Sequence, residues 1–325
     1  MQDIVFQLLP IVAFAVGVGI ISAMVGIGGG ILNTPLLIIV FLLPAQQASA
    51  TALVAALFIA VAGTWAYGRQ KPSPIITKVG LLLAVTTAPG SIIGVGLREL
   101  ITDDYLLRLV FGVSLFPVAL KMLFAKQKGR GDLASELAAF DVSDVSRERM
   151  ASALLGAFIG GVAAGLLGIG GGAIVVPVLN ILVGLPMHAA AATSIFTMIF
   201  TAGAGTARNY IGGHVDLVFG LTLGIGMLIG AQFGARFASR VNAAQLKRIF
   251  GLILVFPLVK MMKLGQFWLD PLGVDFLLAT IGDVIIWAII VIPIGIVRMY
   301  QLHRSQNEQN PSTEEAERDI GSQMT

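Results

Sequence analysis

Long apolar stretches decide what this chain of 325 residues can fold into. A helix needs about 20 mostly apolar residues to cross the hydrocarbon core of a bilayer. Hydrophobic residues make up 56% of the sequence and charged residues only 12%, against about 25% charged residues in a soluble domain. Such a chain cannot cover its surface with polar groups, so we expect lipid to cover it. Eleven candidate spans follow from the pattern: 4–24, 28–43, 47–67, 76–97, 105–124, 150–168, 171–185, 188–211, 215–235, 246–264 and 275–298.

Two polar segments divide the apolar sequence. Lys126–Arg149 separates two hydrophobic halves, and Gln301–Thr325 has the composition of a disordered tail. The first stretch carries Asp3 and no positively charged leader, so we interpret it as a retained span and not as a signal peptide. The sequence predicts a first membrane repeat, a cytoplasmic linker, a second membrane repeat, an additional C-terminal span and a cytoplasmic tail, with bounds 1–125, 126–149, 150–264, 265–300 and 301–325.

The two hydrophobic halves are repeats of one another. Val25–Gly68 aligns with Leu167–Tyr210 at a constant offset of 142, and 18 of the 44 positions are identical. The identities include the cluster GIGGG, the proline five residues after it, a second proline and two threonines. After a two-residue length change, the two glycines of a G-x-x-x-G pattern also match. The sequence therefore predicts an all-α, polytopic membrane protein built from two similar halves.

The basic residues predict the orientation of these halves. With the linker inside, 16 of the 21 Lys and Arg residues fall on the cytoplasmic side, as the positive-inside rule requires, and Arg98 counts among those outside. Each half then makes five crossings, and an odd number turns the second half upside down relative to the first. Inverted repeats of this kind are common in secondary transporters. The short spans 28–43 and 171–185 open on glycines and contain a proline, so each is either a full crossing or a re-entrant hairpin.

The GIGGG clusters indicate breaks between helices. Glycine costs about 1 kcal/mol relative to alanine in a helix interior, and irregular backbone at membrane depth is tolerated only where it is buried or lines a watery cavity. A helix that starts after such a break points its free N–H groups at the cavity, which makes an anion site without a charged side chain. Close helix packing is the alternative role. Packing is the preferred interpretation of the G-x-x-x-G patterns Gly90–Gly94 and Gly230–Gly234.

Polar residues near the breaks complete the predicted site, because intramembrane polar groups tend to face the bundle interior. A single Ser or Thr can also bond a carbonyl one turn back in its own helix, so threonines that the repeat places symmetrically carry more weight. Arg208 is either an anion ligand or an interface anchor, and His188 and Asp283 are alternative proton carriers. The predicted substrate-binding residues are Gly28, Gly29, Gly30, Asn33, Thr51, Thr64, Gly170, Gly171, Gly172, Thr193, Ser194, Thr206 and Arg208.

Several classes of protein are disfavoured by what the sequence lacks. The absence of cysteine excludes disulfides, thiolate catalysis and cysteine metal sites. The glycine clusters are neither a P-loop nor a dinucleotide fingerprint, because no G-K-[S/T] follows them and no predicted strand precedes them. No His, Asp or Glu cluster suits a metal, and no serine or paired carboxylate has a catalytic pattern. We therefore expect no enzyme activity, no cofactor and no nucleic-acid partner.

The doubled GIGGG-to-proline pattern, at Gly26–Pro35 and Gly168–Pro177, resembles the sulfite exporter TauE/SafE family, also called the TSUP transporters. The segments around Ala50–Thr51, Ala192–Ser194 and Ala62–Thr64 add to the resemblance, which covers about residues 5–265. It implies a transporter of sulfur-containing anions, such as sulfite, thiosulfate or small organosulfonates like sulfoacetate, in the cell (inner) membrane. The eleventh span and the long linker depart from the family's usual pattern.

Other functions stay open on the sequence alone. An anion channel would need a continuous pore, a transporter of another small organic anion would need the same breaks, and a helper subunit could dock a partner through its central linker. The predicted partners are the lipid bilayer and a small anion, and a homo-oligomer is left open.

Overall fold

The computed structural model of the chain describes residues 2–101, 105–110 and 145–238, with Asp103, Val113, Phe116 and Phe140. The chain divides into two compact units, Met1–Met262 and Lys263–Thr325, and every described residue belongs to the first. The predicted spans 246–264 and 275–298 and the tail 301–325 lie outside the described residues, as do most of the linker 126–149 and much of the span 105–124.

The described ranges are helical and contain no strand, as the sequence predicts. Five of the helices are long and apolar enough to cross a membrane: α3, α4, α7, α9 and α10. The helices of the first half are α1 (Gln2–Val25), α2 (Gly30–Ile39), α3 (Ala45–Gly68) and α4 (Thr77–Leu100). Those of the second half are α7 (Arg147–Leu167), α8 (Gly172–Pro177), the π-helix η2 (Val178–Val183), α9 (Met187–Ile211) and α10 (Leu217–Ala238).

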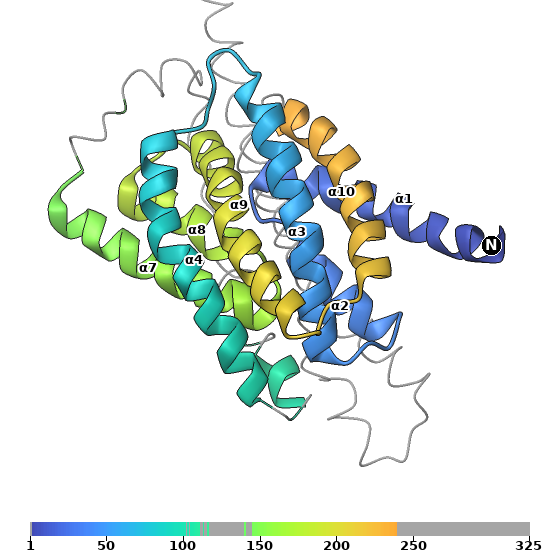
Figure 1. Cartoon of the computed structure of the whole chain (residues 1–325). Coiled ribbons are helices and arrows are strands. Elements are labelled where there is room, and N and C mark those ends of the chain that lie inside the picture. Colours follow the sequence, from blue (N-terminus) through green and yellow to red (C-terminus); the bar gives the residue numbers. More distant parts are fainter. Residues whose placement is uncertain are drawn as a thin grey trace, which may run out of the picture. The chain divides into compact units, whose positions relative to one another are not determined.

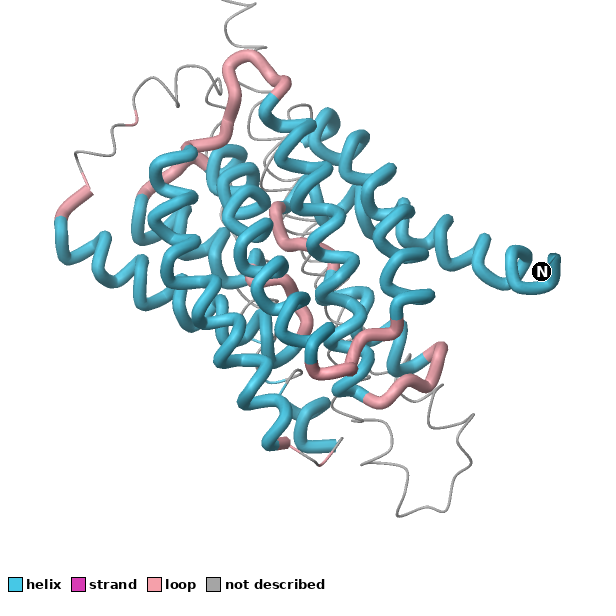
Figure 2. The backbone as a smooth tube through the Cα atoms, in the orientation of Figure 1, coloured by secondary structure: helices cyan, strands magenta, loops and turns pink. Residues whose placement is uncertain are grey.

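Local sequence fixes where several helices start. The matched prolines Pro44 and Pro186 are the N-cap residues of α3 and α9. Proline disfavours helical backbone in the residue before it, which separates each of these helices from the segment that precedes it. Ser146 caps α7, because its Oγ accepts a hydrogen bond of 3.4 Å from the N–H of Arg149. Figure 2 shows the short loops that join these helices.

The segments after the glycine clusters are short helices. With 10 residues α2 is about 15 Å long, half of the roughly 30 Å hydrocarbon core, and α8 with η2 is of similar length. Neither is long enough to cross alone. Both end in the same turn, in which the N–H of Leu43 donates to Leu37 and that of Leu185 donates to Leu179. Leu42 has a φ of 54° in this turn, where the equivalent residue of the second half is Gly184 with a φ of 88°.

The helices of the two halves are interleaved. Helix α1 packs along α10, and α4 packs along both α7 and α9. Helices α3 and α9 are antiparallel at the centre of the bundle, as Figure 1 shows. Gly205 contacts Leu53, and Gly63 contacts Ile195, which is the order expected for antiparallel helices. The same figure shows α10 running parallel to α3, and α4 parallel to α9. Equivalent helices of the two halves therefore run in opposite directions.

The G-x-x-x-G patterns serve this packing. A Cβ on Gly90 would lie 2.6 Å from the carbonyl oxygen of Phe158 in α7, and one on Gly94 would lie 2.9 Å from the N of Leu166. In the second half a Cβ on Gly230 would lie 2.8 Å from the N of Ile20 in α1. Only glycine lets the backbones approach this closely. The packing interpretation of these patterns is confirmed.

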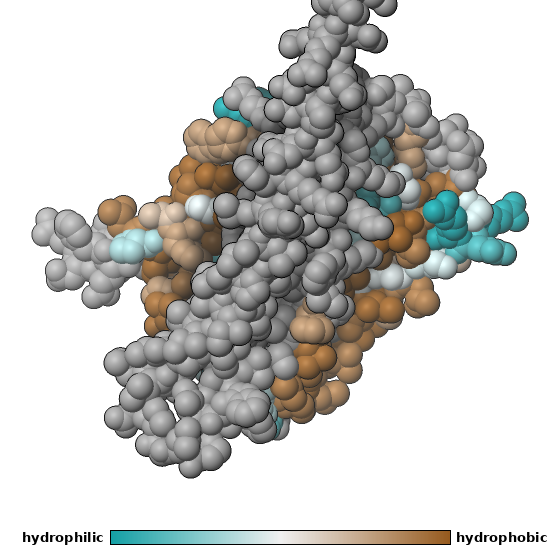
Figure 3. Space-filling model, turned by 180° about the vertical axis from the view of Figure 1, so that it is seen from behind, coloured by the Kyte–Doolittle hydropathy of each residue, from teal (hydrophilic) through white to brown (hydrophobic). Residues whose placement is uncertain are grey.

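The outer faces of the helices are apolar. Exposed residues of α4 and α10 include Val85, Ile92, Leu221, Ile225 and Phe233. Figure 3 shows hydrophobic side chains over much of the described surface on one face of the molecule. At the end of α3 the guanidinium carbon of Arg69 lies 3.6 Å from the ring centroid of the exposed Trp65. An apolar surface with amphipathic aromatic and basic residues at a helix end suits a bilayer and its headgroup region.

Candidate functional site

The two glycine clusters cross each other in backbone contact. A Cβ on Gly30 would overlap the carbonyl oxygen of Gly168 and lie 2.8 Å from the Cα of Ile169. A Cβ on Gly172 would overlap the carbonyl oxygen of Gly26 and lie 2.8 Å from the Cα of Ile27. These two sets of contacts are related by the repeat offset of 142. The last glycine of each cluster therefore lets one helix break pass against the other.

The first glycine of each cluster allows the break to pack closely against a helix of the opposite half. A Cβ on Gly26 would lie 2.5 Å from the Cα of Ala191 in α9, and one on Gly168 would lie 2.6 Å from the Cα of Ser49 in α3. The hydroxyl of Ser194 also donates a 3.1 Å hydrogen bond to the carbonyl of Gly26. The predicted role of close packing thus applies to the outer glycines of each cluster.

The middle glycines leave backbone donors free. In the described part of the chain, no acceptor bonds the N–H groups of Gly28, Gly29, Gly170 or Gly171. Gly29 and Gly171 are the N-cap residues of α2 and α8, with φ of 71° and 90°. Donors at the start of a helix bind anions because the N–H groups and the helix dipole both favour negative charge. The middle of each cluster is the part that can serve a ligand.

Two methionines lie against these free donors. Met198 lies at both breaks, because a Cβ on Gly28 would be 2.8 Å from its Cε and one on Gly170 would be 2.8 Å from its Sδ. Met227 covers the first break, where a Cβ on Gly29 would be 3.2 Å from its Sδ. Methionine is flexible, so these side chains can vacate the space next to the donors without a backbone shift.

The predicted residue Asn33 lies at the first break beside an unpredicted one, Ser22. The amide of Asn33 donates to the Sδ of Met227 at 2.9 Å, while its Oδ1 and the Oγ of Ser22 are buried without a partner among the described residues. A Cβ on Gly29 would be 3.4 Å from the Oγ of Ser22. Polar atoms left unsatisfied in the interior are unusual and mark a site that a ligand or water completes. The sequence did not indicate Ser22, because its counterpart in the second half is Ala164 and the repeat therefore gives no symmetric polar pair.

The symmetric threonines divide into two kinds. The hydroxyl of Thr51 accepts a 3.0 Å hydrogen bond from the N–H of Asp216, and that of Thr193 accepts one of 3.0 Å from the N–H of Ile76. Each threonine thereby ties its helix to the loop before α10 or α4. Thr64 and Thr206 instead carry buried hydroxyls that have no partner within the described ranges.

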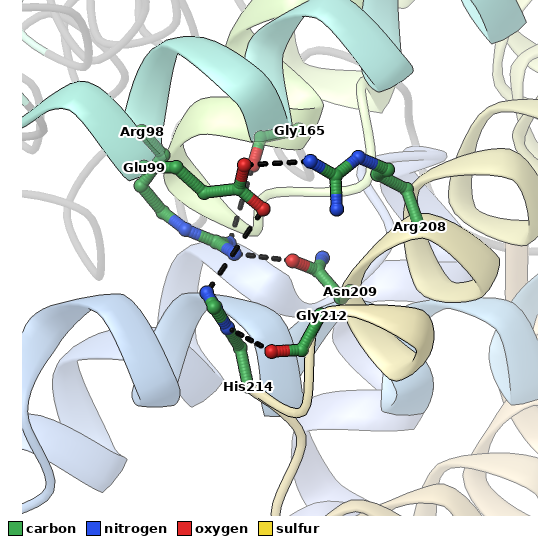
Figure 4. Close-up of polar contacts among 7 residues, drawn as sticks. All are labelled: Arg98, Glu99, Gly165, Arg208, Asn209, Gly212 and His214. Atoms are coloured by element: carbon green, nitrogen blue, oxygen red, sulfur yellow. Dashed lines mark hydrogen bonds and ion pairs between the residues drawn. The ribbon is translucent and has the colours of Figure 1, made fainter.

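Arg208 lies away from the glycine breaks, near the end of α9. Its guanidinium forms an ion pair of 2.6 Å with Glu99, which also lies 3.9 Å from the ring of His214. Figure 4 shows these side chains together with Arg98 and Asn209. The other proposed titratable residue, His188, is placed with its Nε2 at 2.8 Å from the carbonyl oxygen of Ala238. Asp283 lies outside the described residues.

Arg98 is the functional candidate that the sequence analysis missed. The charge count places it among the loop residues outside the membrane, but α4 continues to Leu100 and Arg98 is 0% exposed. Its guanidinium donates to the carbonyl of Gly165 at 3.4 Å and to the side-chain oxygen of Asn209. Helix ends are uncertain by several residues in a sequence, and burial here depends on α7 and α9, so no local signal marks this arginine.

These features define a multi-pass, all-helical membrane protein in which two helix breaks meet in the interior. The chain belongs to the sulfite exporter TauE/SafE family, whose sequence profile matches residues 11–261. The probable membrane transporter protein YunE of Bacillus subtilis is 29% identical over 218 residues, 63% of this chain and 79% of that protein. A probable membrane transporter protein of Haemophilus influenzae is 28% identical over 195 residues, 59% of this chain and 67% of that protein.

A second Bacillus subtilis relative, the probable membrane transporter protein YdhB, is 27% identical over 203 residues, 62% of this chain and 78% of that protein. No solved structure matches the chain. The family is named as an exporter and its relatives as probable transporters. The chain is therefore a membrane transporter of the TauE/SafE family, and the names point to transport and not to an enzyme.

Proposed function

We propose that this transporter exports a small sulfur-containing anion, sulfite or an organosulfonate such as sulfoacetate, across the cell (inner) membrane by alternating access. The substrate site lies at the crossing of the two helix breaks, and its main ligands are the N–H groups of Gly28, Gly29, Gly170 and Gly171. The name of the family supports the sulfur chemistry, and the free donors of the site support the anion chemistry.

One observation carries this proposal: two helix breaks with free donors meet at one place, and among the described residues Arg98 is the one basic side chain that is fully buried. The donors come from equivalent positions of the two halves, so one anion between them would contact both. Backbone N–H groups suit a sulfonate or sulfite because its oxygens accept several hydrogen bonds at once. Asn33 and the hydroxyls of Thr64 and Thr206 are the proposed side-chain contributors, since each has a buried polar atom without a partner in the described part of the chain.

The inverted-repeat architecture is part of the same proposal. Equivalent contacts at both breaks and the opposite directions of equivalent helices support two halves that face one central site from both sides. In transporters of this design the site lies near the bilayer midplane and opens to each side in turn. We also propose that residues 126–149 form a cytoplasmic linker and that residues 265–300 form an additional membrane span.

Transport into proteoliposomes tests this proposal. The purified chain should take up labelled sulfite or sulfoacetate with saturation, and a pH gradient across the membrane would reveal coupling to protons. Gly171→Ala is the key variant, because its added Cβ would meet Thr201 at an ordinary contact distance of 3.4 Å, so that its structural cost is limited to the φ of 90°, while it crowds the free donors. We expect Gly171→Ala to fold and to lose most of its transport.

Two outcomes would contradict the proposal. If the Gly171→Ala protein folds and has normal affinity and transport, the breaks do not form the substrate site. Non-saturating conduction by the wild-type protein would identify an anion channel in place of a transporter. Gly203→Ala is the matched control, since a Cβ there meets only Leu57 at 3.8 Å and lies on α9 away from both breaks.

A further inference from the structure

Two arginines share one carboxylate where α4 and α9 end. Glu99 pairs with Arg208 at 2.6 Å, whereas Arg98 contacts only neutral groups, the carbonyl of Gly165 and the amide of Asn209 (Figure 4). Within the ranges that the structure describes, no carboxylate forms an ion pair with Arg98. A buried cation whose neighbouring carboxylate is paired with a second arginine is only partly compensated, and the negative end of the α7 dipole offsets only part of the remaining cost. The local charge balance therefore favours an added anion.

Three buried polar atoms on α4 and α9 also lack partners among the described residues. They are the Nε of Arg98, the Nδ2 of Asn209 and the Oγ of Ser91, and all three side chains are 0% exposed. Gly165 joins them, since its carbonyl accepts from Arg98 while its Cα packs against the backbone of Ser91. The two nitrogens are donors and the hydroxyl can donate, so an acceptor with several oxygens would satisfy the group.

The repeat shows that capping a carbonyl does not require an arginine here. In the first half the hydroxyl of Tyr67 donates at 2.8 Å to the carbonyl of Ala23, near the end of α1. The equivalents of these residues are Asn209 and Gly165, and between them lies Arg98 of α4 in the first half, whose own equivalent in α10 is Ala238. A neutral side chain performs the structural task in one half. Capping the carbonyl of Gly165 therefore does not explain why residue 98 carries a positive charge.

The interface leading to Arg98 is polar along its length. Thr201 donates to Thr87 at 2.7 Å, and Thr197 donates to the carbonyl of Gly80 at 3.1 Å, all between α4 and α9. The equivalent interface between α3 and α10 has Ile59 in place of Thr201, Met227 in place of Thr87 and Ala55 in place of Thr197. At these three positions polar side chains line only the α4–α9 interface, which ends at Arg98, whereas the α3–α10 interface has one hydrogen bond of 3.1 Å from the amide of Gln232 to the carbonyl of Ala62.

We propose that Arg98, Asn209 and Ser91 form a second anion site, which binds the charged oxyanion group of the transported substrate between α4, α7 and α9. The inference rests on the proposed transport of a small sulfur-containing anion and adds the cationic ligand that the glycine breaks lack. Gly165 lies three residues before Gly168, so this site adjoins the second break.

Titration calorimetry on the purified, full-length chain in detergent tests the site with sulfite and sulfoacetate as probes. Arg98→Gln keeps hydrogen-bond donors and removes the charge, and we expect it to weaken binding roughly tenfold or more, because charge-assisted hydrogen bonds are about twice as strong as neutral ones. Arg98→Lys keeps the charge and should lose less. Asn209→Asp places a carboxylate beside Arg98, so it should abolish anion binding while thermal stability is kept.

Tyr67→Phe is the matched control, because it removes the equivalent carbonyl bond from the first half. We expect it to lower stability and leave anion affinity unchanged. A folded Arg98→Gln or Asn209→Asp protein that binds both probes like the wild type would overturn the proposal. If Arg98→Gln does not fold, Asn209→Asp decides alone, because it preserves the size of the side chain.

The same titrations separate this inference from the proposed function. Wild-type binding of sulfite that neither variant changes would keep the function and remove the site. Wild-type binding of acetate but of neither sulfur anion, with the same dependence on Arg98, would keep the site and refute the proposed substrate. A wild-type protein that binds none of the three anions would refute both.

Discussion

Gly172→Ala and Gly171→Ala are adjacent changes of one methyl group that should have different effects. A Cβ added at Gly172 is a poor fit, since it would lie 2.8 Å from the Cα of Ile27 and overlap the carbonyl of Gly26. Carbon atoms in good contact are about 3.5–4.0 Å apart, so the two breaks would have to separate by about 1 Å. Overpacking typically costs about 1–3 kcal/mol, and we expect the upper end because the obstructing atoms are backbone.

The neighbouring change has a different physical cost. At Gly171 the Cβ would lie 3.4 Å from Thr201, an ordinary contact, and the cost comes from the φ of 90°, roughly 1–2 kcal/mol for an L-residue with left-handed backbone. We therefore expect Gly172→Ala to be the less stable protein. Thermal unfolding of both purified variants, with size-exclusion profiles before heating, measures the difference. Gly30→Ala repeats the test at the other break, where its Cβ meets Gly168.

The result that would refute this reasoning is a Gly172→Ala protein at least as stable as Gly171→Ala. It would mean that the breaks are not in backbone contact, and the division of each cluster into packing and ligand-binding glycines would fall with it.

Three further predictions use other contacts. Thr51→Val and Thr193→Val each remove the acceptor of a loop N–H and should cost about 1–3 kcal/mol in thermal unfolding; a loss of sulfite affinity at unchanged stability would instead assign these hydroxyls to the substrate. Leu42→Gly relieves a φ of 54° and should raise the unfolding temperature. Left-handed backbone costs an L-residue roughly 1–2 kcal/mol, which exceeds the cost of about 0.5–1 kcal/mol for the greater chain entropy of an unfolded glycine. A lower unfolding temperature would show that the contacts of the leucine side chain matter more. Cysteines introduced at Asp103 and Gln127 into this cysteine-free chain should be labelled from outside and from the cytoplasm respectively, and labelling of position 103 from the cytoplasm would reverse the topology.

Apolar length and proline position were enough to predict the long helices. The expected spans 47–67 and 188–211 became Ala45–Gly68 and Met187–Ile211, because each starts directly after a matched proline. The clusters GIGGG were predicted as breaks for a similar local reason, since consecutive glycines destabilise a helix whatever surrounds them.

Roles that depend on partners from distant segments could not be predicted. Nothing in the sequence distinguishes Gly29 from Gly30, because the difference lies in what each faces, a flexible methionine or the backbone of the other half. The burial of Arg98 could not be predicted for the same reason, since its partners Gly165 and Asn209 lie 67 and 111 residues away along the chain. The repeat relates Thr51 to Thr193, but their hydrogen-bond partners lie in loops that carry no such signal.

The interleaving of the halves has a consequence for biosynthesis. Helix α1 packs along α10, yet 192 residues separate Val25 from Leu217. At about 5–20 residues per second, a ribosome needs roughly 10–40 s to make that stretch. During that time the side of α1 that α10 will cover, which includes Gly19, faces lipid or an insertion factor. A chain arrested after its first half would therefore hold an unpaired α1, a form that membrane quality control could recognise.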